Sequence, residues 1–458
     1  MTDERDPPET VLDEKGTSRD GDDASNEPPS ARDESSLEDA SADFVEELDG
    51  DAESGEADGD EAMEDEAQLE SGEYPSSDLA SGEVESGSLG SGEVGPDDGF
   101  AGSFERYGDV GELDDPDERT DPGVERSSLT LGSWSAAFAH PRRNRFAGAV
   151  LGGAIGDAMG HPTEFVGSFA EIHSRWPPRG VEGYELWRSA GSTNVAPYTD
   201  DTQMAECVLR SLMRARTERL ELDAAMTDLA QRFVQWANDP EGGHRAPGNA
   251  CLAGCRALEE GAHWSTAGGP EAGGCGSVMR AYPFGLAFAG DVQRAERWAV
   301  AHSKLTHRDP IALAACAAMA VGVVRILRDE PVALVCSEMI AAAARYSART
   351  GTMVARAYEE ACDGTQPEVT LDRLRGWAAH EAIAAAVYLF ARHPDDPRAA
   401  ILEGANTPGD SDSLATLAGA LVGARVGLSA IPEPWVRDIE RRDALLALAS
   451  DASDAFSR

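Results

Sequence analysis

Negative charge is distributed very unevenly along this chain of 458 residues. Residues 1–140 hold 44 aspartates and glutamates against 7 lysines and arginines, a net charge of −37, whereas the other 318 residues have a net charge of only −8. The acidic part is also rich in serine and glycine and poor in large apolar side chains, so burial cannot offset its loss of chain entropy on folding. We therefore predict a disordered, low-complexity acidic region at residues 1–140 and a single compact domain at residues 141–450.

The composition also excludes several classes of protein. An acidic region repels phosphate and the folded part has no basic stripe, so direct binding of nucleic acid is not expected. No apolar run reaches the roughly 18–20 residues of a membrane span without interruption, and the N-terminal stretch lacks the apolar core of a signal peptide. The odd number of cysteines, 7 in all, fits reduced thiols in a cytoplasmic protein. The acidic region itself is either a solvating extension or an arm that docks or inhibits.

Hydrophobic periodicity in the folded part is that of helices. Alternation with a period of two residues is nowhere sustained, and alanine dominates, as it does in tightly packed helices. The sequence predicts helices at 145–160, 204–212, 223–236, 249–258, 292–301, 310–327, 331–346, 354–361, 371–390, 397–402, 412–427 and 433–448. The almost wholly apolar stretch at 310–327 is expected to be a buried central helix, and 161–197 a non-periodic loop. The predicted fold class is therefore all-α, a compact domain of many helices.

Glycines four residues apart predict an unusually close contact between helices. Gly148, Gly152 and Gly156 fall on one face of a helix and form a smooth ridge there. A glycine inside a helix costs about 1 kcal/mol relative to alanine, so a buried close crossing is the expected compensation. A second run, Leu414–Gly427, has a similarly narrow face of alanine and glycine.

Two stretches rich in carboxylates each open a predicted helix. Asp200 and Asp201 stand between two threonines, and about two hundred residues later Asp410 and Asp412 alternate with serines. Oxygen donors in this density suit Mg²⁺, Mn²⁺ or Ca²⁺, and Glu164 in a loop adds another. The twelve-residue calcium loop is excluded because its final glutamate is missing, and soft metals lack histidine pairs near these acids. The alternative interpretation is that the acids and threonines cap their helices.

A glycine-rich turn at residues 273–280 precedes an apolar helical stretch. Exposed backbone N–H groups at such a turn can hold an anion such as a diphosphate. The turn is not a Walker loop, because a lysine followed by serine or threonine is absent. His307 stands just before another predicted helix, where a capping or packing role is the alternative to a role in binding.

In their order and spacing, these segments resemble the ADP-ribosylglycohydrolase family, which includes the bacterial enzyme that reactivates dinitrogenase reductase. The resemblance is carried by Gly148–Gly160 together with Glu164, Thr199–Thr202, Gly276–Arg280, Thr306–His307, Gly376–Ala382 and Gly409–Ser413. Each motif is modest alone, but six in order are specific. The resemblance covers roughly residues 145–430, and the N-terminal third has no counterpart in it.

The resemblance implies an all-helical domain with a binuclear Mg²⁺ or Mn²⁺ centre. It implies three sets of site residues: metal ligands Thr199, Asp200, Asp201, Asp410, Asp412 and Ser413; a mobile acid, Glu164; and an ADP-ribose pocket lined by Gly276, Ser277, Met279 and His307. Two departures from the family pattern are Ser413, where threonine is common, and Pro408, where glycine is common. Neither departure removes a ligand.

The implied activity is metal-dependent hydrolysis of the N- or O-glycosidic bond between ADP-ribose and a protein side chain or small molecule. Two cations would activate a water, and attack at the anomeric carbon would pass through an oxocarbenium-like state. Glu164 or Asp201 would transfer the proton, and the sequence leaves that choice open. The alternatives are a protein that binds ADP-ribose with little or no turnover, and a structural helical protein. Loops at 168–197 and 240–248 are expected to determine specificity, and the sequence is compatible with a monomer.

Overall fold

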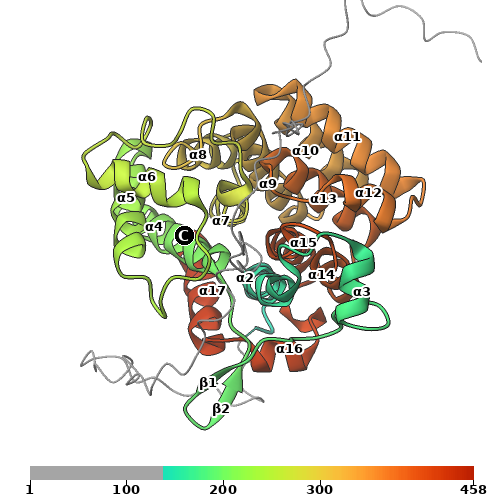
Figure 1. The fold of residues 1–458 in the computed structure, drawn as a ribbon. Coiled ribbons are helices and arrows are strands. Elements are labelled where there is room, and N and C mark those ends of the chain that lie inside the picture. Colours follow the sequence, from blue (N-terminus) through green and yellow to red (C-terminus); the bar gives the residue numbers. More distant parts are fainter. Residues whose placement is uncertain (1–137, 458) are drawn as a thin grey trace, which may run out of the picture. The chain divides into compact units, whose positions relative to one another are not determined.

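A computed structural model of the chain describes residues 138–457. The predicted disordered region lies outside these residues apart from its last three, of which Phe138 is buried in the core. The described part of the chain is a domain of helices with one short hairpin (Figure 1). The predicted all-α fold class is therefore confirmed.

Most of the helices follow one another through short connections, and the longest connection separates α6 from η3. The first half contains α2 (Pro141–Gly160), η2 (His161–Thr163), α3 (Phe169–Arg175), β1 (Arg188–Ala190), β2 (Thr193–Val195), α4 (Asp200–Glu218), α5 (Leu222–Asn238), α6 (Asn249–Glu259), η3 (Cys275–Ser277), α7 (Tyr282–Ala287) and α8 (Val292–Ser303). The second half contains α9 (Pro310–Leu327), α10 (Val332–Tyr346), α11 (Ala348–Cys362), α12 (Pro367–Arg373), α13 (Ala379–Arg392), α14 (Pro397–Ala405), α15 (Ser411–Val426), η4 (Leu428–Ala430), α16 (Glu433–Asp438) and α17 (Arg442–Ser457).

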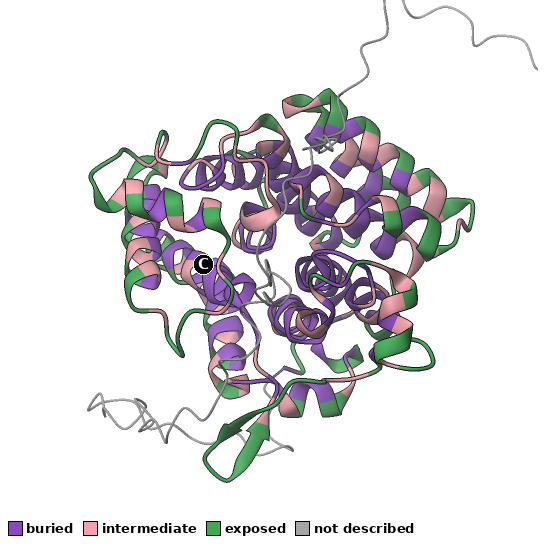
Figure 2. Ribbon diagram, in the orientation of Figure 1, coloured by how far each residue is buried: buried purple, intermediate pink, exposed green. Residues whose placement is uncertain are grey.

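Helices α2 and α15 lie side by side in the middle of the domain (Figure 1). Their facing residues are the predicted glycine ridge and the predicted narrow face. A Cβ atom at Gly152 would collide with the carbonyl group of Gly419, and one at Gly148 would collide with that of Gly423. The two backbones thus touch directly, which confirms the predicted close packing. Nearly all of both helices is buried (Figure 2).

Two groups of helices enclose this central pair. Helices α8 to α11 and α13 pack on one another on one side, and α4, α5 and α6 form the other side (Figure 1). Strands β1 and β2 form an antiparallel hairpin in which Ser189 faces Asn194, and both strands are almost wholly exposed. The hairpin and α3 fall in the stretch predicted to be a loop. Both are short, so they leave little periodic signal in the sequence.

The predicted helix boundaries differ from the observed ones in two informative places. The predicted helix at 371–390 is divided into α12 and α13, and the break contains Gly376 with a φ angle of 86°. The predicted helix at 433–448 is divided into α16 and α17, and Arg441 in that break has a φ angle of 50°. A residue in the left-handed region cannot continue a right-handed helix, so periodicity alone does not reveal these breaks.

Helix α9 is the predicted buried central helix. Its 18 residues have a mean hydropathy of 2.1, and by length and composition it meets the requirements of a membrane span. However, 72% of it is buried within the domain, which is typical of a core helix. The apolar run of α9 is interrupted only by Arg325, so the helix meets the length and composition of a span although its apolar run is not continuous.

The contact between α2 and α15 predicts how glycine substitutions affect stability. Gly152→Ala should lower the free energy of unfolding by about 1–3 kcal/mol or more, because the added methyl meets backbone that cannot move aside. Thermal unfolding of the purified wild-type protein and the Gly152→Ala variant measures this difference. Gly183→Ala is the control, since no atom lies within 4 Å of its added methyl. Equal melting temperatures for the two variants would contradict the close contact.

Candidate functional site

The start of α4 is held by a carboxylate from α2. Asp157 is fully buried. Its Oδ1 accepts from the backbone N–H and hydroxyl of Thr199 at 2.9 and 2.7 Å, and its Oδ2 accepts from those of Thr202 at 3.0 and 2.6 Å. Thr199 occupies the N-cap position but makes no side-chain cap of its own. Asp157 thus accepts from the N–H groups of Thr199 and Thr202, and the Asp200 N–H donates to the carbonyl of Arg245 at 3.3 Å. The carboxylates of Asp200 and Asp201 are therefore not needed as caps for these groups.

The start of α15 is fixed against the end of α2. The hydroxyl of Ser411 donates to the carbonyl of Gly160 at 2.9 Å, and Thr163 donates to the Ser411 hydroxyl at 3.0 Å. Gly160 also lies against the backbone of Asp412, where a Cβ would collide. The Ser411 hydroxyl is therefore structural, and the residues on either side of it remain candidate ligands.

The two acidic stretches meet in space. The hydroxyl of Ser413 in α15 donates to Oδ2 of Asp201 in α4 at 3.0 Å, across 212 residues of sequence. The thiol of Cys275 in η3 donates to Oδ2 of Asp410 at 2.6 Å and lies 3.6 Å from the Ser413 hydroxyl. Three segments far apart in the sequence thus contribute to one cluster.

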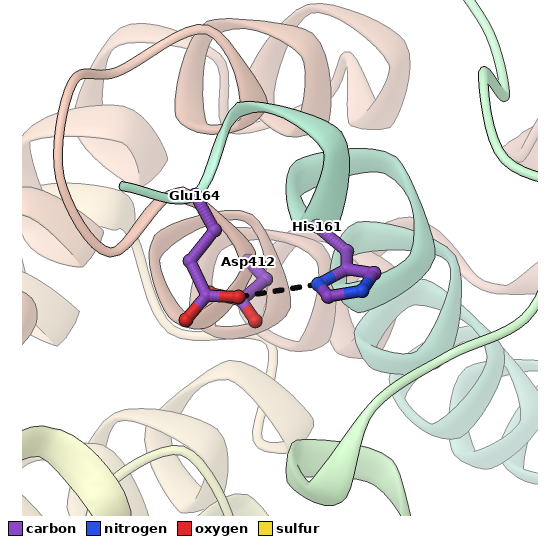
Figure 3. A group of neighbouring side chains, drawn as sticks. All are labelled: His161, Glu164 and Asp412. Carbon is purple, nitrogen blue, oxygen red and sulfur yellow. Dashed lines mark hydrogen bonds and ion pairs between the residues drawn. The ribbon is translucent and has the colours of Figure 1, made fainter. Parts of the chain in front are cut away.

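Glu164 reaches the same cluster from the segment after η2. Figure 3 shows its carboxylate beside Asp412 and the ring of His161. Its Oε2 lies 3.1 Å from Nδ1 of His161, and one ligand atom from each of the three residues lies within 4.8 Å of the other two. Such spacing is compatible with a shared cation.

Burial and mutual repulsion raise the pKa values of these carboxyl groups. Burial first, and the charge of Asp412 second, raise the pKa of Asp157 to about 6 and that of Glu164 to about 10. The same two causes, in the same order, raise the pKa values of the three other acids well above their usual range: Asp200, Asp201 and Asp410. Together with Asp412, whose charge acts on all five of them, these carboxyl groups form one electrostatic unit of six.

This cluster needs positive charge from outside the protein. Among residues 138–457, its one ion pair is the His161–Glu164 contact, and no lysine or arginine pairs with it. Buried carboxylates without such partners are stable at neutral pH only if protons or cations neutralise them. Burial also raises the pKa of the Cys275 thiol well above its usual value, so this group stays protonated. The donors are then oxygens apart from one imidazole, and they fit hard divalent cations.

Two of the predicted substrate-binding residues differ in what they contact. Met279 lies beside the cluster, with its Sδ 4.0 Å from the Ser413 hydroxyl. Ser277 is fully buried, and its hydroxyl accepts a hydrogen bond from Ser303 at 2.9 Å. The Ser277 hydroxyl is therefore hydrogen-bonded within the core. The sequence alone did not distinguish Ser277 from Met279 in this respect.

His307 and Gly276 are in contact with each other. A Cβ at Gly276 would lie 2.7 Å from Sγ of Cys251 and 3.0 Å from Cε1 of His307, so a side chain at this position would have to displace its neighbours. Nδ1 of His307 lies 2.7 Å from the Thr306 hydroxyl. Burial first, and the charge of Arg280 second, lower the pKa of His307 to about 3, so the ring is neutral. It packs and hydrogen-bonds at the wall of the turn.

Arg280 organises the glycine-rich turn and was not selected from the sequence. It is fully buried and donates to Met204 Sδ at 3.2 Å, to Cys251 Sγ at 3.3 Å and to the Thr306 hydroxyl at 2.6 Å. It also donates to the carbonyl of Gly276. One cation thus ties the turn to α4 and to the segment before α9.

Sequence reasoning also missed three residues of the cluster itself. Asp157 had a usable signal, because an acid inside an apolar, glycine-rich helix is rarely buried without a partner. His161 stands three residues before Glu164, a spacing that places both on one side of a turn. Cys275 gave no signal, since nothing in the sequence relates a thiol in a glycine-rich turn to Asp410.

The structure also contains a cavity of about 240 Å³ away from these residues. It is lined by residues of α4, α7, α8 and α17 and the segments that follow α4 and α7: Leu212, Ala215, Arg216, Arg219, Leu220, Glu221, Ala287, Phe288, Arg294, Trp298 and Phe456. No predicted site residue lines it, so it is not the candidate site.

Comparison with known proteins identifies the class to which this fold and site belong. The family model of the ADP-ribosylglycohydrolases matches residues 139–458. The chain therefore belongs to the ADP-ribosylglycohydrolase family, a family of hydrolases, as the order of its motifs indicated.

Individual relatives resemble the chain over the same region. It is 29% identical to the ADP-ribosyl-(dinitrogen reductase) glycohydrolase of Rhodospirillum rubrum, over 67% of this chain and 97% of that protein. It is 26% identical to the human ADP-ribosylhydrolase ARH3, over 69% of this chain and 94% of that protein. It is 29% identical to the ADP-ribosylarginine hydrolase Tri1 of Pseudomonas putida, over 68% of this chain and 78% of that protein.

The raised pKa values predict how stability depends on pH when no cation is bound. The folded protein holds protons on Asp157 and Glu164 more tightly than the unfolded chain, in which both titrate near pH 4. It therefore binds more protons, and the free energy of unfolding falls as pH rises. The fall begins near pH 4 and continues through about 6 for Asp157 and towards 10 for Glu164.

Thermal unfolding in a chelator at pH 5 to 9 measures this dependence. Glu164→Gln should reduce the fall, and the difference between the two chains isolates Glu164 from the other carboxylates. Identical pH dependence in both chains would show that Glu164 titrates normally.

Proposed function

We propose that this domain hydrolyses the N- or O-glycosidic bond between ADP-ribose and a modified protein side chain or small molecule, using two divalent cations, Mg²⁺ or Mn²⁺. The observation that carries the proposal is a cluster of five buried carboxylates and the partly buried Glu164, none of which has a lysine or arginine partner in the described domain. Support also comes from relatives named as a glycohydrolase or hydrolases of ADP-ribosyl groups.

The residues that we expect to hold the cations come from the starts of α4 and α15: Thr199, Asp200, Asp201, Asp410, Asp412 and Ser413. Cations held in this way lower the pKa of a water and bind sugar hydroxyl groups. Asp157 fixes the orientation of the first set through its four hydrogen bonds, and the Ser413–Asp201 contact joins the two sets. Positioning of this kind decides whether the donors converge within the tolerance of a cation site.

We assign proton transfer to Glu164 rather than to Asp201. The Glu164 side chain is 9% exposed and lies on the irregular segment between η2 and α3, whereas Asp201 is enclosed by Ser413 and the other acids. Cleavage at the anomeric carbon requires a proton on the leaving atom. A carboxyl group with a raised pKa holds a proton at neutral pH and can donate it. Nδ1 of His161, 3.1 Å away, is the hydrogen-bond partner of the Glu164 carboxyl group.

The alternative function is binding of ADP-ribose with little or no turnover. Peptides ADP-ribosylated on arginine or serine, incubated with the full chain with and without Mg²⁺, distinguish the two. Release of ADP-ribose that depends on Mg²⁺ supports the hydrolase, and binding without release supports the alternative.

We also propose that the protein is cytoplasmic and monomeric. The free state of all seven cysteines supports the cytoplasmic location.

Replacement of Glu164 tests its assigned role. Glu164→Gln should lower kcat by about 10²–10⁴-fold, because the amide cannot donate a proton to the leaving atom. Affinity for ADP-ribose should change little, since the shape of the side chain is kept. Steady-state kinetics and calorimetry measure these quantities, with the exposed Glu368→Gln as a matched control. Wild-type kcat in Glu164→Gln would refute the assignment.

Removal of two proposed ligands tests the cation site independently of activity. Mg²⁺ at a hundred times its Kd should stabilise the wild-type chain by about 2.7 kcal/mol for each cation bound. The double variant Asp200→Ala with Asp412→Ala should lose this stabilisation, while the exposed Asp363→Ala should keep it. Thermal unfolding with and without Mg²⁺ gives the result. A double variant that Mg²⁺ still stabilises would place the cations elsewhere.

A further inference from the structure

Two aromatic side chains remain exposed beside the acidic cluster and stack on each other. Phe165 is 64% exposed and Trp377 is 43% exposed. Their ring centroids lie 5.1 Å apart and the ring planes are inclined by 28°. Large apolar side chains are usually buried in the core. A stacked aromatic pair that is exposed to solvent beside a candidate site therefore indicates a binding surface.

The backbone at Phe165 is held in an unfavourable conformation. Its φ angle is 66°, in the left-handed region that bulky residues rarely adopt. The backbone is fixed there by hydrogen bonds from the Phe165 N–H to the carbonyl of Gly409 at 3.0 Å and from the Gly409 N–H to the carbonyl of Val166 at 3.2 Å. Strain of this kind, of the order of 1–3 kcal/mol, persists where the surroundings impose it and is concentrated at functional sites.

Both aromatic residues are attached to the cluster through their neighbours. Phe165 directly follows Glu164, and its partner Gly409 directly precedes Asp410. Trp377 follows Gly376, where a Cβ would lie 3.1 Å from Cβ of Asp410. The Trp377 carbonyl also accepts from the backbone N–H of Cys275 at 3.2 Å, next to the thiol that contacts Asp410. The pair therefore stands at the solvent side of the cluster, on the side of Glu164.

We propose that the Phe165–Trp377 pair holds the leaving group of the substrate, and that this leaving group is the guanidinium of an ADP-ribosylated arginine. The inference rests on the proposed function, in which Glu164 donates a proton to the leaving atom and must therefore lie beside it. A guanidinium is planar and cationic, so it stacks on aromatic faces and is attracted by nearby carboxylates. A serine hydroxyl offers neither a flat surface nor a charge. Phe165 and Trp377 are thus specificity-determining residues.

The experiment compares two peptides of one sequence that carry ADP-ribose on arginine or on serine at the same position. The full chain is measured as wild type and as Phe165→Ala, Trp377→Ala and Trp377→Leu, the last of which keeps an apolar side chain but removes the aromatic face. Leu334→Ala, at another exposed apolar residue, is the matched control. We measure kcat/KM for both peptides, their Kd in the Glu164→Gln background, and the Kd of free ADP-ribose.

The expected result is a loss confined to the arginine-linked peptide. A cation–π contact of this exposure predicts a two- to thirtyfold fall in its kcat/KM and a similar rise in its Kd, for all three variants. The serine-linked peptide and free ADP-ribose should change less than twofold. Equal falls for both peptides, no fall for either, or weaker binding of free ADP-ribose would overturn the proposal, and the last would place the adenine on the pair.

The binding measurements keep the two proposals separate. If the wild-type chain cleaves neither peptide, the proposed hydrolase function fails for arginine- and serine-linked ADP-ribose on proteins. The Kd values then still show whether the pair prefers the arginine-linked peptide. If the chain cleaves the peptides and the variants behave as wild type, the function stands and the role of the pair fails.

Discussion

The direct backbone contact between α2 and α15 is the constraint on which the candidate site depends. Glycines on both helices remove the side chains that would hold them apart, so the carbonyl groups of one helix lie against the other. At the end of this contact, Gly160 lies against the backbone of Asp412. The start of α15 is thereby placed next to Asp157, which in turn holds the start of α4. A bulkier residue in the ridge would therefore separate the acids as well as weaken the core.

The acidic cluster and the rest of the domain make opposing contributions to stability. The cluster collects six carboxylates in a buried place, where repulsion and loss of hydration favour their protonated forms. The tightly packed apolar interior, whose segments are coloured as buried in Figure 2, supplies the stability that tolerates this arrangement. A domain of this construction is expected to depend on bound cations for part of its stability, as many metal-binding domains do.

The sequence revealed the parts of the structure that have a local signature. Four-residue spacing of glycine indicated the α2–α15 contact, and alanine-rich periodicity indicated most of the helices. Dense acids at helix starts indicated which residues would converge, and the order of the motifs indicated the family. The assignment of these acids as ligands stays a prediction, because the geometry brings them together without showing what they bind.

The missed features depend on contacts between distant segments. The capping of α4 by Asp157 joins residues more than forty positions apart, so the sequence offered only the neighbouring threonines and acids as alternative caps. The burial of the Ser277 hydroxyl and the contact of Cys275 with Asp410 are likewise set by tertiary packing. The breaks at Gly376 and Arg441 follow from backbone angles that hydrophobic periodicity does not report.

The pairing of α2 with α15 also has a consequence for biosynthesis. One helix of the central pair begins the described domain and the other ends about thirty residues before the end of that domain, so the ribosome must make almost the whole domain before the pair can form. Until then the ridge on α2 has no partner, and the acids of α4 have nothing opposite them. The growing polypeptide should therefore need protection from aggregation during most of its synthesis, and neither half of the domain can work as a separate gene product.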